Sequence, residues 1–147
     1  MKYTEIERKF LIDSSKIKLK GKKELIIQGY LIIESNRHIR VRIINNKKAI
    51  ACYKEGNGIK RTEIEFRIPL KEAKELIKKC VVVVEKTRRK IKIGKHTWDI
   101  DYYPDHDLLV GEIELRKENE KFKKPNWILE EVSGQSAYSN INLGRKI

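Results

Sequence analysis

The fold of this chain is decided by the stretch Tyr3-Thr4-Glu5-Ile6-Glu7-Arg8-Lys9-Phe10-Leu11. Successive side chains of a β-strand point to opposite faces, so Glu5, Glu7 and Lys9 would share one face of a strand here. Ile6 and Phe10 would share the other. An exposed strand carries such a pattern at no cost. The pattern gains weight because almost every later strand-like stretch repeats a charged face opposite an apolar one.

The composition is that of one strongly basic domain. The chain has 147 residues, which is the size of an ordinary domain with a core of its own, and we expect a single domain over residues 1–147. Hydrophobic residues make up only 39% and charged residues 37%, so either the surface is unusually ionic or some charge lies inside. The net charge of +13 indicates an anionic partner such as nucleic acid, polyphosphate or a nucleotide.

Cysteine usage and hydropathy bear on the compartment. Cys52 and Cys80 lie far apart and show no metal-ligand spacing, so we expect both to pack as small apolar residues in a reducing environment. No apolar run approaches membrane-spanning length, and the chain begins on a strand without a leader-like apolar region. We therefore expect a cytoplasmic protein, a monomer or homodimer, with no membrane partner.

Alternating apolar and polar residues, separated by turn-forming residues such as Asn45-Asn46 and Gly56-Asn57-Gly58, predict a series of hairpins. The expected strands are 3–11, 24–34, 38–43, 48–55, 60–68, 81–91, 97–103 and 108–116. Helical spacing predicts an amphipathic helix over 70–80, after Pro69. The tail is expected to hold a short helix at 117–124, an extended segment at 127–132 and a closing helix at 140–147. About eight strands and few helices point to an antiparallel sheet closed or nearly closed on itself.

Charged side chains collect on one face of these strands. A flat sheet would leave them in water, whereas a barrel would gather them in its lumen, where carboxylates and bases must pair or bind something. A lumen holding both signs suits a polyanionic ligand with divalent cations, because bases contact phosphates and carboxylates hold metals. The acidic set is Glu5, Glu7, Glu63, Glu65, Asp101, Glu112 and Glu114, and the basic set is Lys9, Arg40, Arg42, Lys54, Arg61, Lys86 and Arg88.

An ordered set of motifs resembles one known family. Glu5-Ile6-Glu7-Arg8-Lys9 matches the ExExK signature of the CYTH superfamily, also called triphosphate tunnel metalloenzymes. The likeness continues over nearly the whole chain through Gln28-Gly29-Tyr30-Leu31, Arg40-Val41-Arg42, Lys54, Arg61-Thr62-Glu63-Ile64-Glu65, Lys86-Thr87-Arg88, Trp98-Asp99-Ile100-Asp101-Tyr102-Tyr103, Glu112-Ile113-Glu114, Trp127, Glu131-Val132-Ser133-Gly134 and Tyr138-Ser139-Asn140. A single ExExK would be weak evidence, but the ordered set is strong.

The resemblance implies an α+β fold, mainly antiparallel β, in which an eight-stranded closed tunnel with a few flanking helices binds a triphosphate along its axis. It implies that the acidic set holds one or two Mg²⁺ or Mn²⁺ ions and that the basic set grips the phosphates. Glu5, Glu7, Lys9 and Tyr30 are the candidate catalytic residues, with Tyr30 close to bound phosphate. Mg²⁺ prefers carboxylate, phosphate and water oxygens, which agrees with such a site. Arg40 and Arg42 suit bidentate phosphate contacts that lysine cannot make.

The substrate is less closely defined. The short chain and its opening motif favour hydrolysis of inorganic tripolyphosphate, with a class IV-type adenylate cyclase or a thiamine or nucleoside triphosphatase as alternatives on the same tunnel. A nucleic-acid-binding barrel is a hypothesis of another class, disfavoured because the arginines share faces with glutamates that would repel a nucleic-acid backbone. A polyphosphate-binding barrel without catalysis is a further one. His38, His96 and His106 show no metal or triad pattern, and we interpret them as surface or turn residues.

Overall fold

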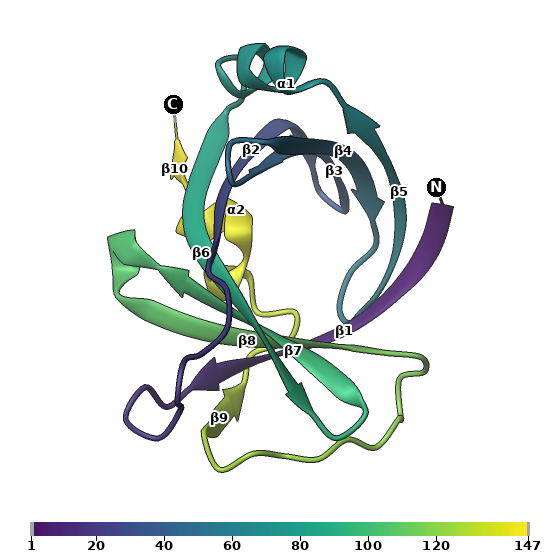
Figure 1. Ribbon diagram of the computed structural model, residues 1–147. Coiled ribbons are helices and arrows are strands. Elements are labelled where there is room, and N and C mark those ends of the chain that lie inside the picture. Colours follow the sequence, from purple (N-terminus) through teal and green to yellow (C-terminus); the bar gives the residue numbers. More distant parts are fainter. Residues whose placement is uncertain (1, 147) are drawn as a thin grey trace.

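Eight long strands form the body of the protein. The computed structural model describes residues 2–146, and Figure 1 looks along the barrel. The strands are β1 (Lys2–Ile12), β2 (Glu24–Glu34), β3 (Arg37–Ile44), β4 (Lys48–Glu55), β5 (Lys60–Ile68), β6 (Val82–Ile93), β7 (His96–Tyr103) and β8 (Leu108–Leu115). Each lies within a few residues of a strand expected from alternation, which confirms the period-two interpretation.

The strands close on themselves. Their order is β6-β2-β3-β4-β5-β1-β8-β7, every neighbouring pair is antiparallel, and β7 pairs back to β6. The predicted eight-stranded closed barrel is therefore confirmed. Two short strands extend the sheet, because β9 (Ile128–Glu131) pairs with the end of β1 and β10 (Arg145–Lys146) pairs with the start of β6.

One helix covers the outer face of β2, β3 and β4. It is α1 (Leu70–Ile77), at the top of Figure 1, and it buries Ala73 against Val41, Ile43 and Ala49. The expected helix over 70–80 ends earlier, because the chain turns at 78–80 to enter β6. Gly29 is needed at this approach, since a Cβ atom there would lie 2.5 Å from the sulfur of Cys80.

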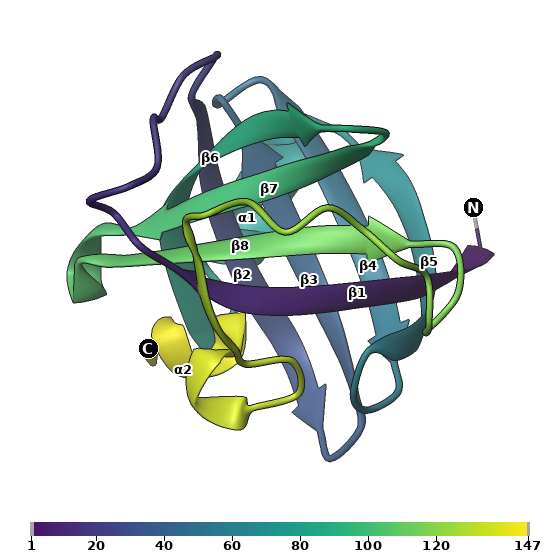
Figure 2. The ribbon, with the colours of Figure 1, turned by 90° about the horizontal axis from the view of Figure 1, so that it is seen from below.

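An aromatic core lies outside the barrel on the opposite side. Trp98 stacks edge-on with Phe10 and Trp127 at ring-centroid distances of 5.6 Å and 5.4 Å. Phe122 joins it at 5.8 Å. The segment 116–127 runs across the outer face of β7 and β8 (Figure 2), which places the Phe122 ring in this core. The expected helix at 117–124 is wrong, because an open loop lets Phe122 reach the core.

The end of the chain turns back onto the barrel. After the 3-10 helix Ser136–Tyr138 comes α2 (Asn140–Leu143), whose N-terminus is capped by Ser139. The expected helix over 140–147 stops at Leu143, because Gly144 packs against Val82 and the next two residues pair as β10; Ile147 lies outside the described residues. A second 3-10 helix, Pro104–His106, links β7 to β8. Over residues 2–146, no helix is long and apolar enough to cross a bilayer.

Candidate active site

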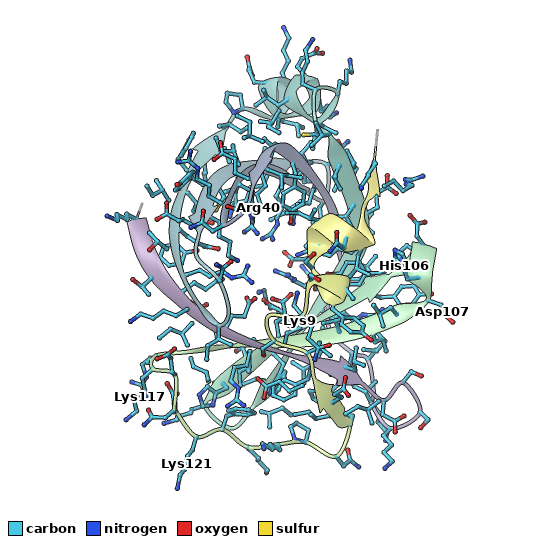
Figure 3. The ribbon with its side chains drawn as sticks, turned by 180° about the vertical axis from the view of Figure 1, so that it is seen from behind. Lys9, Arg40, His106, Asp107, Lys117 and Lys121 are labelled. Atoms are coloured by element: carbon cyan, nitrogen blue, oxygen red, sulfur yellow. The ribbon has the colours of Figure 1, made fainter. Side chains whose placement is uncertain are left out.

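The barrel encloses a polar cavity of about 1200 Å³. Of the predicted site residues, all line it except Lys86 and Asp101, which are buried. Figure 3 shows Arg40 of β3 and Lys9 of β1 pointing into the central space from opposite sides. The structure therefore gathers into one channel side chains from seven strands that the sequence spreads over more than a hundred residues.

One wall of the channel is acidic. It comprises Glu5, Glu7, Glu63, Glu65, Glu112 and Glu114, which come from β1, β5 and β8. Alternation on each strand points them inward, and the strand register places Glu7 directly opposite Glu114. Like charges so close in a closed space repel each other unless protons or cations intervene.

The pKa values of this wall report that crowding. Burial, and then the charge and hydrogen bond of Glu112, raise the pKa of Glu7 well above its ordinary value. Glu7 thus holds the proton of the pair, and the pKa of Glu112 is lowered. Burial, together with Glu5 and Glu63, also raises the pKa of Glu114. Carboxylates that need a proton to coexist fit a divalent cation, because their oxygens are the ligands that Mg²⁺ and Mn²⁺ prefer.

Glu63 differs from its neighbours because it is already paired. It is 1% exposed, and its carboxylate lies 3.1 Å from Lys54 Nζ and 3.7 Å from Arg40 Nη2. Tyr3 also donates a hydrogen bond to it. Burial acts to raise its pKa, but Lys54 and Arg40 hold it at about 2. Lys54 Nζ also lies 2.7 Å from Glu5 Oε1, so this lysine joins two members of the acidic wall.

The facing wall is basic. Arg40 and Arg42 come from β3 and Arg88 from β6. Burial, and then the charges of Arg40 and Arg88, lower the pKa of Arg42 to about 10. Three guanidinium groups held together against their mutual repulsion form a ready site for a polyanion.

Hydrogen bonds behind this wall fix its geometry. Arg42 Nε donates to Gln28 Oε1 at 2.7 Å, and Gln28 Nε2 donates to the Tyr30 hydroxyl at 2.6 Å. Gln28 is fully buried. Because the Tyr30 oxygen accepts from Gln28, its own hydrogen is available to donate into the cavity that Tyr30 lines.

Lys86 and Asp101 form a buried cluster with Arg88. Asp101 is fully buried, and its carboxylate lies 2.8 Å from Lys86 Nζ and 2.7 Å from Arg88 Nε. Burial acts to raise the pKa of Asp101, but Lys86 and Arg88 hold it at about 2. Lys86 also donates to Asn140 of α2 at 3.1 Å. Both oxygens of Asp101 are thus engaged by bases, an arrangement that orients Arg88 rather than leaving a free metal ligand.

Lys9 and Arg61, which both line the cavity, each donate a hydrogen bond to a backbone carbonyl. Lys9 Nζ donates to the carbonyl of Tyr138 at 3.1 Å, which ties the ExExK lysine to the chain's C-terminal segment. Arg61 Nε donates to the carbonyl of Gly58 at 3.2 Å, in the turn between β4 and β5. Each ammonium or guanidinium group keeps further donors for a ligand.

The expectation that the three histidines are surface or turn residues is wrong for two of them. His38 lies on β3, two residues before Arg40, and lines the cavity. His96 begins β7, is buried, and its Nε2 lies 2.6 Å from Glu120 Oε2. Alternation with Arg40 and Arg42 was a signal that could have found His38. For His96 no local signal existed, since its partner lies in the loop. His106 is exposed, as expected. Cys52 and Cys80 are buried and free.

A closed antiparallel barrel with opposed acidic and basic inner walls defines a class of phosphate-binding tunnel proteins, and residues 3–145 match the model of the CYTH domain. The chain belongs to the CYTH family. It is 38% identical over 143 residues, 95% of this chain and 92% of the relative, to a protein named inorganic triphosphatase from Acetivibrio thermocellus.

Solved structures agree with this assignment. The crystal structure of the inorganic triphosphatase NE1496 superposes with a TM-score of 0.66 and 26% identity, covering 97% of this chain and 95% of that one. The structure of the PH1012 protein from Pyrococcus horikoshii OT3 superposes with a TM-score of 0.61 and 28% identity, covering 78% of this chain and 80% of that one. A putative adenylate cyclase from Bacillus halodurans shares the fold, with a TM-score of 0.59 and 17% identity, covering 80% of this chain and 83% of that one.

Proposed function

We propose that this protein is a divalent-metal-dependent triphosphatase that hydrolyses inorganic tripolyphosphate inside the barrel. The observation that carries the proposal is the facing of an acidic wall and a basic wall across one cavity. The two walls neutralise each other only in part: Glu63 pairs with Lys54 and Arg40, but the pKa values of Glu7 and Glu114 are raised and the pKa of Arg42 is lowered. A polyanion with its cations satisfies both walls at once, which a single ion of either sign does not.

The carboxylates of Glu5, Glu7 and Glu114, with Glu65 and Glu112, are the proposed metal ligands. A bound Mg²⁺ or Mn²⁺ ion would neutralise phosphate charge and lower the pKa of a coordinated water. Glu63 is proposed to position two bases, because it forms ion pairs with Lys54 and Arg40. Asp101, expected as a metal ligand from the family resemblance, is proposed instead to orient Arg88.

Arg40, Arg42, Arg88 and Lys9 are the proposed phosphate-binding groups, with Lys54 and Arg61 towards the β4–β5 side. Fixed guanidinium groups stabilise the charge of the equatorial oxygens during phosphoryl transfer without reorganising. The Tyr30 hydroxyl adds a neutral donor beside them. Lys86, fully buried against Asp101, supports Arg88 from behind.

The test is a panel of substrates assayed with Mg²⁺, with Mn²⁺ and with EDTA. Phosphate, pyrophosphate and cyclic AMP are measured after addition of tripolyphosphate, ATP and thiamine triphosphate. We expect metal-dependent phosphate release that is fastest from tripolyphosphate and ceases in EDTA. Cyclic AMP from ATP would identify a cyclase instead. Tight tripolyphosphate binding with no product would indicate a binding barrel, and salt-sensitive RNA binding without turnover would favour the nucleic-acid hypothesis.

A further inference from the structure

His38 occupies an unusual place in the channel. It shares the inward face of β3 with Arg40 and Arg42, and the register places it opposite Lys54 of β4. Alternate residues of a strand lie about 6.7 Å apart, so Arg42, Arg40 and His38 form a row of roughly 13 Å along the wall. Arg40, the middle residue of the three along β3, is labelled in Figure 3. His38 stands at its end nearest the turn that joins β2 to β3.

The imidazole has no partner for one of its nitrogens. Its ring packs edge-on against Tyr30, with ring centroids 5.0 Å apart. Its Nε2 is buried and makes no hydrogen bond within residues 2–146. A buried polar atom without a partner carries a free-energy penalty, and such atoms in native proteins commonly mark a ligand or water position.

The surroundings keep this imidazole uncharged. Burial, and then Arg40, Lys54 and Arg61, lower its pKa to about 3, against which Glu63 acts only weakly. At neutral pH the ring therefore offers one N–H donor and one acceptor. With Nδ1 as the acceptor, the Nε2–H group is a neutral donor at the end of a row of cations.

We propose that His38 is a substrate-binding residue whose Nε2–H donates a hydrogen bond to a phosphate oxygen of the triphosphate, at the end of the substrate that extends beyond Arg40. The contact gives the orphaned nitrogen its partner and fixes how far the substrate reaches along β3. The inference rests on the proposed function, since it takes the ligand to be a triphosphate lying against Arg42 and Arg40. It adds a specificity-determining position to the arginine row.

The experiment compares H38A, H38Q and I39A with the wild type. Ile39 lies on the same strand with its side chain on the opposite, outward face, so I39A reports general weakening of β3. We expect H38A to raise KM for tripolyphosphate roughly tenfold with kcat changed less than about threefold, the loss of one charge-assisted hydrogen bond. H38Q, whose side-chain amide also donates, should recover most of this loss. Binding of tripolyphosphate to the metal-free proteins, measured by calorimetry, should follow the same order.

The outcomes distinguish a substrate-binding role of His38 from a packing role. If H38A and I39A give the wild-type KM and Kd, the inference is overturned. It is also overturned if H38A and H38Q raise KM equally and both lower the melting temperature, because a packing role explains that result. Wild-type protein that binds tripolyphosphate without hydrolysing it overturns the proposed function, while the Kd series still tests His38. Wild-type protein that neither binds nor hydrolyses it overturns both.

Discussion

Arg88 donates two parallel hydrogen bonds to Asp101, from Nε to Oδ1 at 2.7 Å and from Nη2 to Oδ2 at 2.8 Å. Asp101 is fully buried and also compensates the charge of Lys86. The pair therefore fixes the orientation of a guanidinium group that lines the channel while neutralising a second buried cation. Its removal should affect folding and activity together.

D101N is expected to lower the free energy of unfolding by about 3–5 kcal/mol, because two buried cations lose their counter-charge. It should also lower kcat/KM for tripolyphosphate. E75Q is the control, since Glu75 is exposed on α1 and, among the ion pairs of residues 2–146, pairs only with the exposed Lys78 at 3.2 Å; we expect it to change stability by less than about 1 kcal/mol. Urea unfolding of both variants measures the contrast, and equal effects would argue against the orienting role of Asp101.

E7Q is expected to separate activity from stability. Burial, and then Glu112 and Glu5, raise the pKa of Glu7, so its carboxyl already holds a proton in the metal-free protein and a neutral amide replaces it there at little cost. The melting temperature without metal should stay equal or rise. Metal-dependent turnover should fall roughly 100-fold or more, because the amide is a poor ligand for Mg²⁺.

Differential scanning fluorimetry with and without Mn²⁺ provides the measurement for E7Q. Wild-type protein should gain stability on adding Mn²⁺ and E7Q should gain less. E130Q, at an exposed position of β9, is the control and should behave as the wild type. Full turnover by E7Q would remove Glu7 from the proposed metal ligands.

R42K should show that geometry, and not charge alone, matters at this position. Lysine keeps the positive charge but loses the planar donors, including the hydrogen bond to Gln28. We expect kcat/KM to fall roughly ten- to hundredfold. Q28L should cost less, because it leaves the guanidinium in place but frees it to turn. R67K, at an exposed position outside the cavity lining, is the control, and steady-state kinetics that do not distinguish it from R42K would contradict the assignment.

The outside of the barrel should steer substrate inward. Acidic and basic groups of the channel nearly cancel, so the net charge of +13 is carried almost wholly by the exterior. We expect kcat/KM to fall several-fold between about 0.05 and 0.5 M salt, since the Debye length that screens exposed charges shortens from about 14 Å to about 4 Å over this range. Lys117 and Lys121 lie exposed on the loop beside the channel-lining Arg116 and Glu120 (Figure 3).

The double variant K117E/K121E tests this steering. It should lower kcat/KM at low salt, flatten the salt dependence and leave kcat unchanged, because neither lysine lines the cavity. A salt response identical to that of the wild type would show that these lysines do not contribute.

The lowered pKa of His38 predicts that the stability of the protein depends on pH. Its pKa in the folded protein is about 3 instead of its ordinary 6.5. Between these values the unfolded chain binds a proton that the folded protein does not, so stability falls as pH falls through this window. The wild type should lose stability relative to H38Q by up to about 1.4 kcal/mol per pH unit. Urea unfolding at pH 7, 6, 5 and 4 measures the difference, and parallel curves would show that His38 titrates normally.

Local structure could be predicted from the sequence. Alternation in stretches such as Lys60–Ile68 indicates each long strand, and the same parity indicates which charged side chains point inward. The loop 117–124 could not be predicted, because the packing of Phe122 on Trp98 of the distant strand β7 outweighs helical propensity. The inward position of His38 follows from its parity with Arg40, although no metal or triad motif includes it.

The roles within the channel depended on distances that no pattern contains. Asp101 and Glu112 look alike in the sequence as inward carboxylates of neighbouring strands. In the folded protein Asp101 is locked between Lys86 and Arg88, whereas Glu112 lines the cavity beside Glu7. The register between β6 and β7 places Asp101 beside a base, and the register between β1 and β8 places carboxylates beside each other.

By itself the sequence determined the strands, the face on which each charge lies and the likeness to the CYTH family, because the period-two geometry of a strand is set by neighbouring residues alone. Only the tertiary structure decided that β2 pairs with β6 and that β1 pairs with both β5 and β8, which closes the ring, and that acidic and basic side chains face each other across it. Pairing between distant strands depends on the twist and register of the whole sheet, which no local stretch specifies.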